Sequence, residues 1–184
     1  SRGTGTYGGL TGIRQLNASG YARFVAKLAP DGTVLWSHAI GGTPFDIEAV
    51  LSRLRRDDII THAFTGWRPG GIVTDAGRVA AAAHEARTRG VRFDVGHGQG
   101  SFTWPVAEAA LADGFRPDTI SSDLHRLNVV TPVHDLATTL SKFLCLGMPL
   151  ADVIAASTVN AAHALKRPEL GSLKPGSAGD ATIL

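Results

Sequence analysis

The sequence predicts an α/β fold, and within that class the second half of a parallel β/α barrel. Apolar stretches typical of strands alternate four times with helix-like stretches, an order that implies a parallel sheet covered by helices. Four successive strands end in a His or Asp residue, and the carboxyl ends of barrel strands share one face. The chain has 184 residues, whereas a complete eight-stranded barrel needs about 250.

The expected strands are short apolar stretches followed by helical periodicity. They lie at residues 33–40, 58–64, 91–96 and 118–123, and a fifth begins at 180–184. The expected helices lie at residues 44–56, 76–90, 101–114, 134–147 and 149–166. Ser101 is the expected N-cap of the third helix, and Gly90, Gly114 and Gly147 stand where a left-handed C-terminal residue is favourable. A doubly wound sheet is the other candidate, but it concentrates its chemistry at one switch point, so four decorated strands favour the barrel.

Composition excludes several classes of partner. Hydrophobic residues make up 43% of the chain, enough for the core of one domain. The net charge is +2 with scattered Lys and Arg, so no nucleic-acid partner is expected. No apolar run reaches the roughly 18 residues of a membrane span, and no leader opens the chain, so we expect no membrane contact and a cytoplasmic location. Cys145 is alone and is expected to be a small buried apolar residue.

The residues at the strand ends are the candidate metal ligands. His38, His62, His97 and Asp123 lie at or just beyond the ends of successive strands. Imidazole and carboxylate groups suit Zn, Mn or Fe. A bound metal lowers the pKa of a water molecule from about 15.7 to about 7, which favours hydrolysis of an amide or ester. A single histidine at a strand end is more often structural, so the hypothesis depends on the series.

The other polar residues near this rim have weaker signals. His125 follows Asp123 by two residues and is expected either to contact substrate or to line a loop. Asp94 alternates away from His97 and is a candidate hydrogen-bond partner for a ligand. Surface or capping roles are expected for the three remaining histidines, His84, His134 and His163.

The stretch GHGQGS, residues 96–101, follows a strand and opens a helix, as a phosphate-binding loop does. Ser101 replaces the third glycine of the dinucleotide pattern, so nucleotide binding is a minor alternative. Gly96, Gly98 and Gly100 allow the backbone to run close to a substrate, and a simple tight turn is an equally good interpretation. A Ser-His-Asp triad using Ser101 and Asp123 is conceivable, but there is no G-x-S-x-G elbow.

Several stretches resemble the amidohydrolase superfamily, and within it the metal-dependent deacetylases related to dihydroorotases and D-aminoacylases. The resemblance covers nearly the whole chain, and its most specific part runs from the glycine stretch to TISSDLH. The matching stretches are LWSHAIG, DIITHAFTG, RFDVGHGQGSFTWPVAEAALADGFRPDTISSDLH, LSKFLCLGMPLADVIAASTVNAAHAL and GSLKPGSAGDATIL.

The resemblance implies a role for each matching residue. It implies that His38 on barrel strand five and His62 on strand six bind metal, with zinc the expected ion and one or two ions in the complete enzyme. It implies that Asp123 on strand eight binds metal and acts as general base and proton shuttle. His97 and Gly98 on strand seven are implied to lie on the substrate side. The implied reaction is hydrolysis of N-acyl or O-acyl groups on small molecules.

The sequence also departs from the family pattern. It has no His-x-His pair, and Lys27 stands in an expected helix rather than where the family's carboxylated lysine lies. We therefore expect residues 1–170 to form a partial hydrolase barrel that needs upstream ligands, and residues 171–184 to begin the return strand of a small β domain. A half barrel leaves two strand edges and one apolar inner face uncovered, which favours homo-oligomers. The alternative is a non-catalytic truncated fragment or self-associating module.

Overall fold

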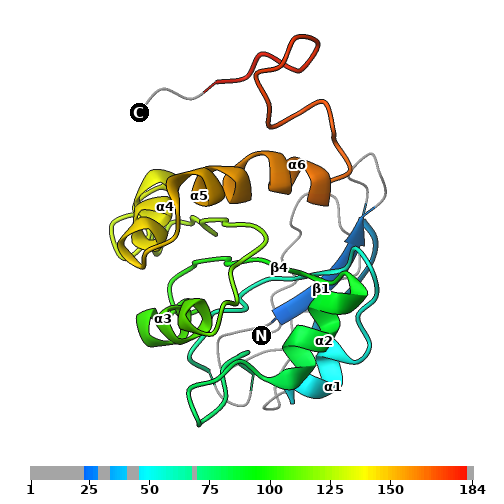
Figure 1. Ribbon diagram of the computed structural model, residues 1–184, viewed down its shortest axis with the longest axis vertical. Coiled ribbons are helices and arrows are strands. Elements are labelled where there is room, and N and C mark those ends of the chain that lie inside the picture. The colour runs from blue at the N-terminus through cyan, green and yellow to red at the C-terminus, as the bar shows by residue number, and fades with distance from the viewer. Residues whose placement is uncertain (1–22, 29–33, 41–45, 68–69, 182–184) are drawn as a thin grey trace, which may run out of the picture. The chain divides into compact units, whose positions relative to one another are not determined.

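The computed structural model describes residues 23–28, 34–40, 46–67 and 70–181 (Figure 1). The chain divides into two compact units, Ser1–Pro44 and Phe45–Leu184. Each unit has its own sheet, and the helices that the structure describes all belong to the second unit. None of the helices in these described ranges is long and apolar enough to cross a membrane.

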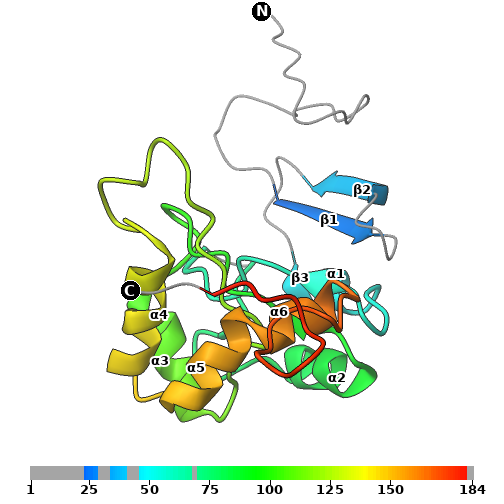
Figure 2. The same cartoon turned by 90° about the horizontal axis from the view of Figure 1, so that it is seen from above.

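The described part of the first unit is an antiparallel ribbon (Figure 2). Strand β1, Arg23–Leu28, pairs with strand β2, Val34–Ile40, so that Arg23 lies opposite Ile40. The predicted strand at 33–40 is confirmed as β2. Its antiparallel partner β1 was not expected, and the expected helix around Lys27 is wrong, because Lys27 lies on β1. The link between the two strands is too short for a parallel crossover, and its sequence contains the turn residues Pro-Asp-Gly at 30–32.

Three segments of the second unit run parallel to one another, as predicted. Strand β3, Ile59–Ile60, pairs with strand β4, Arg92–Phe93, and a parallel bridge joins Asp94 to Thr119. Backbone hydrogen bonds extend the second pairing, because His97 N–H donates to the carbonyl of Ser121 at 3.0 Å. The regular strands are shorter than predicted, since the chain leaves extended geometry where each segment reaches the candidate site. The predicted strand at 180–184 lies largely outside the described residues.

The helices follow the predicted order and cover this parallel core. Their bounds are α1 Ile47–Leu51, α2 Ala81–Arg89, α3 Trp104–Ala112, α4 Leu136–Cys145, α5 Leu150–Ser157 and α6 Val159–Ala164. Helix α1 packs on α2, α4 packs on α5, and α5 continues into α6 (Figures 1 and 2). Asp46 and Asp135 cap the first turns of α1 and α4 with their carboxylates. Gly90 ends α2 with φ 94°, which confirms the predicted left-handed cap.

The helices are shorter than predicted, most clearly α1, which was expected at 44–56 and spans Ile47–Leu51. Two further differences have a local cause. Helix α3 begins after Thr103 instead of Ser101, because Pro105 in its first turn favours the start of a helix. The expected helix at 149–166 divides at Thr158 into α5 and α6. The carbonyl of Ala156 accepts the N–H of Ile120 at 3.1 Å, so this interruption serves the contact between the helix and the parallel core.

The core beneath the candidate site is aromatic. Phe93 meets Phe115 edge to face at 4.9 Å between ring centroids, and Phe64 meets Phe143 in the same way at 6.1 Å. All four rings are almost completely buried. Cys145 is exposed, so its predicted burial is wrong. It follows the buried Phe143 by two residues, which corresponds to about 200° around the helix and turns it to the opposite side.

Candidate metal site at the ends of the parallel segments

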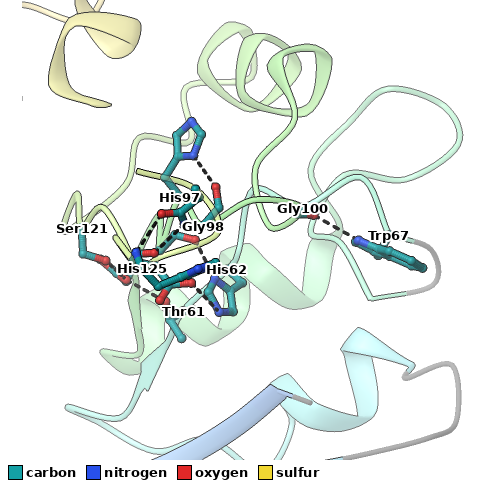
Figure 3. Close-up of polar contacts among 12 residues, drawn as sticks. Thr61, His62, Trp67, His97, Gly98, Gly100, Ser121 and His125 are labelled. Atoms are coloured by element: carbon teal, nitrogen blue, oxygen red, sulfur yellow. Dashed lines mark hydrogen bonds and ion pairs between the residues drawn. The ribbon is translucent and has the colours of Figure 1, made fainter. Parts of the chain in front are cut away.

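His62 and Asp123 meet at the carboxyl ends of two of the parallel segments (His62 is labelled in Figure 3). The Nε2 atom of His62 lies 3.9 Å from Oδ2 of Asp123. The Nδ1 atom of His62 lies 2.6 Å from the carbonyl oxygen of Gly96. Because a carbonyl only accepts, Nδ1 carries a proton and donates it to Gly96, while Nε2 faces the carboxylate.

This arrangement fits two ligands of a divalent metal ion. Metal-binding histidines usually donate their second ring N–H to a carbonyl or carboxylate, as His62 donates to Gly96. Two ligands of a tetrahedral zinc ion, each about 2.1 Å from it, lie about 3.4 Å apart. The 3.9 Å separation is therefore about half an ångström from that value. Among the residues described by the structure, no group of three or more His, Cys, Asp or Glu side chains could hold a metal ion.

Both candidate ligands have a left-handed backbone. The φ angle is 60° at His62 and 46° at Asp123. Such values are uncommon outside glycine and cluster at functional sites, where the surrounding structure offsets a cost of about 1–3 kcal/mol. They also explain why the regular strands end early, since a residue in this conformation cannot continue an extended strand.

A glycine loop, defined here as residues 96–98, separates the two candidate ligands. Gly96 and Gly98 both have positive φ, at 49° and 51°. A Cβ atom at Gly96 would lie 2.7 Å from Nδ1 of His62, and one at Gly98 would lie 2.7 Å from Oδ2 of Asp123. Any side chain at either position would therefore displace a candidate ligand, so the loop needs glycine for space as well as for its backbone conformation.

Asp94 joins the three parallel segments beneath this loop. Its buried carboxylate accepts hydrogen bonds at 2.7 Å from the hydroxyls of Thr61, Thr119 and Ser121. Thr61 directly precedes His62, and Ser121 stands two residues before Asp123. Asp94 was expected to hydrogen-bond a ligand, but its side-chain partners in the described part of the chain are hydroxyl groups that stand next to both candidate ligands.

His97, between the two glycines, is only 2% exposed. Its Nδ1 lies 2.8 Å from the carbonyl of Gly98, and its Nε2 lies 2.8 Å from Nζ of Lys142 (Figure 3 shows the first contact). The ring stacks on Phe102 with centroids 4.6 Å apart. Burial lowers the pKa of His97, and the charge of Lys142 lowers it further. His97 is therefore neutral, with its proton on Nδ1 and its Nε2 accepting from the ammonium.

His125 lies in the exposed loop that follows Asp123 (Figure 3). Its Nδ1 accepts the N–H of Leu127 at 3.2 Å, so in the neutral ring Nε2 carries the proton. Asn128 is completely buried and shapes this loop. Its amide donates to the carbonyl of Asp123 at 2.8 Å, and its Oδ1 accepts the N–H of His125 at 2.7 Å.

Two of these supporting residues were not found from the sequence. Asn128 interrupts the apolar stretch RLNVV, and a polar amide in that position was a usable signal of a buried hydrogen-bonding role. Lys142 occupies an amphipathic helix where lysine is ordinary, so its sequence gave no signal. His38 lies on β2 opposite Val25 in the first unit, and its side chain falls outside the described part of the chain.

Comparison with known proteins identifies the family of this chain. Residues 58–184 match the sequence model of the Amidohydrolase family, and the chain belongs to this family. It is 39% identical to a deacetylase of Brucella anthropi over 144 residues, which are 78% of this chain and 36% of that protein. It is 34% identical to a deacetylase of Enterococcus faecalis over 145 residues, which are 78% of this chain and 39% of that protein.

Solved structures give the same family. A crystal structure of an adenine deaminase superposes with a TM-score of 0.68 and 34% identity over 73% of this chain and 37% of that one. A crystal structure of a dihydroorotase superposes with a TM-score of 0.63 and 40% identity over 69% of this chain and 34% of that one. These likenesses agree with a partial barrel. The chain spans little more than a third of the length of the curated relatives it matches.

Proposed function

We propose that this chain carries half of the active site of a metal-dependent hydrolase that cleaves an acyl amide or ester, of the deacetylase type. The observation that carries the proposal is the pairing of His62 with Asp123, in which Gly96 holds one ring nitrogen and leaves the other facing the carboxylate. In this proposal the described parallel segments are strands six to eight of the barrel and β2 corresponds to strand five. Residues 171–184 begin the small β domain.

The proposed ligands are His62, Asp123 and His38, with zinc as the expected ion. The described part of the chain supports the first two by geometry, and His38 rests on the likeness to the family. Further ligands, supplied in the complete enzyme by residues outside this chain, would complete a site of one or two ions. A divalent ion in this position would activate water and polarise the substrate carbonyl.

Asp123 has the central part in the proposed reaction. Its carboxylate takes a proton from the attacking water and then delivers that proton to the leaving amine or alcohol. Oδ2 of Asp123 faces His62 and has Gly98 on another side, so the absence of a side chain at Gly98 keeps this carboxylate accessible. His62 keeps its proton on Nδ1 throughout, because the carbonyl of Gly96 holds it.

The substrate side of the site is proposed to include His125, Gly98 and His97. His125 is exposed and presents a proton on Nε2, which suits donation to a carbonyl or carboxylate oxygen of a small N-acyl or O-acyl compound. Gly98 leaves room beside Asp123. The ring nitrogens of His97 are engaged by Gly98 and Lys142, so a substrate contact by His97 would use other atoms of the residue.

Two alternatives have different support. Nucleotide binding at residues 96–101 is disfavoured, because the amides of His97 and Gly98 already donate to the carbonyls of Ser121 and Ser122. A self-associating module is favoured by apolar side chains that are exposed on the described surface. They include Leu127, Val130, Leu150 and Ile154.

The proposal is tested with the enzyme that contains this sequence, assayed against a panel of N-acetyl and O-acetyl small molecules. We expect turnover that depends on added zinc and falls at least about a thousandfold in Asp123→Asn, which keeps the size of the side chain but cannot accept the proton. Glu108→Gln on the exposed side of α3 is the matched control and should retain full activity. Unchanged turnover in Asp123→Asn would refute the assigned role.

A further inference from the structure

We infer that Lys142 is a positioning residue that sets the geometry of the candidate metal site through His97 and the glycine loop. This inference rests on the proposed role of His62 and Asp123 as metal ligands. It assigns to a lysine on helix α4 a role that neither its sequence context nor its distance along the chain from the ligands indicates.

Lys142 donates in two fixed directions. Its Nζ lies 2.8 Å from Nε2 of His97 and 2.7 Å from the carbonyl of Pro132. Burial lowers the pKa of Lys142, so the ammonium is held where water does not fully compensate it. The next residue, Phe143, is completely buried and fixes this turn of α4 to the core. Lys142 is therefore an anchored donor, unlike a solvated surface lysine.

The hydrogen bond from Lys142 helps to fix the orientation of the His97 ring. Lys142 holds one ring nitrogen, the carbonyl of Gly98 holds the other, and Phe102 covers a face of the ring. The His97 backbone is fixed as well, because its N–H donates to the carbonyl of Ser121. Because His97 is only 2% exposed, rotation of its ring would break two buried hydrogen bonds, at a cost of about 1–3 kcal/mol for each group left unpaired.

The glycine loop connects the position of His97 to the positions of His62 and Asp123. Gly96 precedes His97, and its carbonyl accepts the Nδ1 proton of His62. Gly98 follows His97 and abuts the carboxylate of Asp123. A shift of His97 therefore moves one neighbour of each ligand at the same time. Outer hydrogen-bond partners of this kind typically change metal affinity by about 10–100-fold.

An apolar residue at position 142 would avoid the cost of desolvating an ammonium. The lysine supplies two directed hydrogen bonds. One goes to Nε2 of His97, which accepts, and the other goes to the carbonyl of Pro132 in the loop before α4. The contribution of Lys142 to site geometry can thus be separated from its contribution to the core, because methionine has similar length and preserves the packing but not the donors.

The experiment compares the 184-residue chain with Lys142→Met, Lys142→Arg and, as matched control, Lys174→Met at an exposed lysine. Zinc affinity is measured by calorimetric titration. Histidine tautomers are measured without metal by long-range proton–nitrogen NMR. We expect Lys142→Met to bind zinc about tenfold more weakly and its His62 to change from a single Nδ1–H tautomer to a mixture. Lys142→Arg, which keeps a charged donor, should lie between Lys142→Met and the unchanged chain, and Lys174→Met should match the unchanged chain.

Each outcome decides the inference. Unchanged zinc affinity together with a single His62 tautomer in Lys142→Met would overturn it. If the unchanged chain binds no zinc, the proposed metal function of this chain fails, while the metal-free tautomer spectrum still supports or overturns the positioning role. If circular dichroism shows that Lys142→Met does not fold, Lys142→Gln is measured in the same two assays. The shorter amide cannot reach both acceptors, so a loss in the same direction is expected and its absence refutes the inference.

Discussion

The imidazole of His62 and the carboxylate of Asp123 face each other at 3.9 Å, although they come from parallel segments that are not direct neighbours in the sheet. The segment carrying the glycine loop lies between them. Because Gly96 and Gly98 have no side chains, His62 can lie against the backbone at Gly96 and Asp123 against the backbone at Gly98. The pair therefore depends on three parallel segments.

Removal of the His62 ring should abolish metal binding by the chain. Zinc binding by His62→Ala is expected to fall below detection in a calorimetric titration, because the described part of the chain has no third ligand near Asp123 to replace the ring. The matched control is His163→Ala, at an exposed histidine on α6, which should keep the original affinity. Equal zinc binding in His62→Ala and His163→Ala would contradict the site.

A methyl group at Gly98 should damage the site more than the fold. Gly98→Ala would place its Cβ about 2.7 Å from Oδ2 of Asp123 and would force alanine to φ 51°. The control is Gly114→Ala, which has φ 74° but open space around the added atom. Both variants should lose about 1–2 kcal/mol of unfolding free energy for the left-handed backbone. Only Gly98→Ala should also lose zinc binding, and equal zinc affinity in the two variants would refute the steric argument.

Asp94 should be a large contributor to stability. Its buried carboxylate accepts three hydroxyl hydrogen bonds that join three parallel segments. Asp94→Ala leaves Thr61, Thr119 and Ser121 without this acceptor, and we expect a loss of about 3 kcal/mol in urea unfolding. The control, Glu108→Ala on exposed α3, should change stability by less than about 0.5 kcal/mol. A loss below 1 kcal/mol in Asp94→Ala would show that water replaces the carboxylate.

Stability should depend on pH through the N-cap of α4. The N–H of Thr138 donates to the carboxylate of Asp135 and lowers its pKa, with further lowering by the Thr138 hydroxyl and the charge of His134. A carboxylate with a lowered folded pKa stabilises the fold above its unfolded pKa of about 3.9, and this contribution disappears as the pH falls through the folded pKa. The melting temperature of Asp135→Ala should therefore lie below that of the unchanged chain at pH 6, and the difference should narrow below about pH 3.9. Asp180→Ala, at an exposed aspartate near the C-terminus, is the control. A difference that stays constant with pH would contradict this account.

Local sequence patterns predicted the order of the helices and strands better than they predicted which of these elements pair or pack together. The order of strands and helices in the second unit follows from apolar periodicity and from glycines such as Gly90, because both act within one turn or strand. The antiparallel partner of β2 was missed, although Pro-Asp-Gly at 30–32 was a turn signal. The exposure of Cys145 depends on which side of α4 packs inward, which the lone residue type did not indicate.

By itself, the sequence determined the chemistry available to this protein. It placed imidazole and carboxylate groups at the ends of parallel segments, and it placed glycines between them, because residue identity and strand ends are local properties. Tertiary structure alone decided which groups meet. Three contacts join residues that are distant in the chain. They are the pairing of His62 with Asp123, the hydrogen bonds that Asp94 accepts from the neighbouring segments, and the contact of Lys142 with His97. Such contacts depend on the three-dimensional packing of elements distant in the chain, where a shift of one ångström makes or breaks a hydrogen bond, and no local pattern encodes that distance.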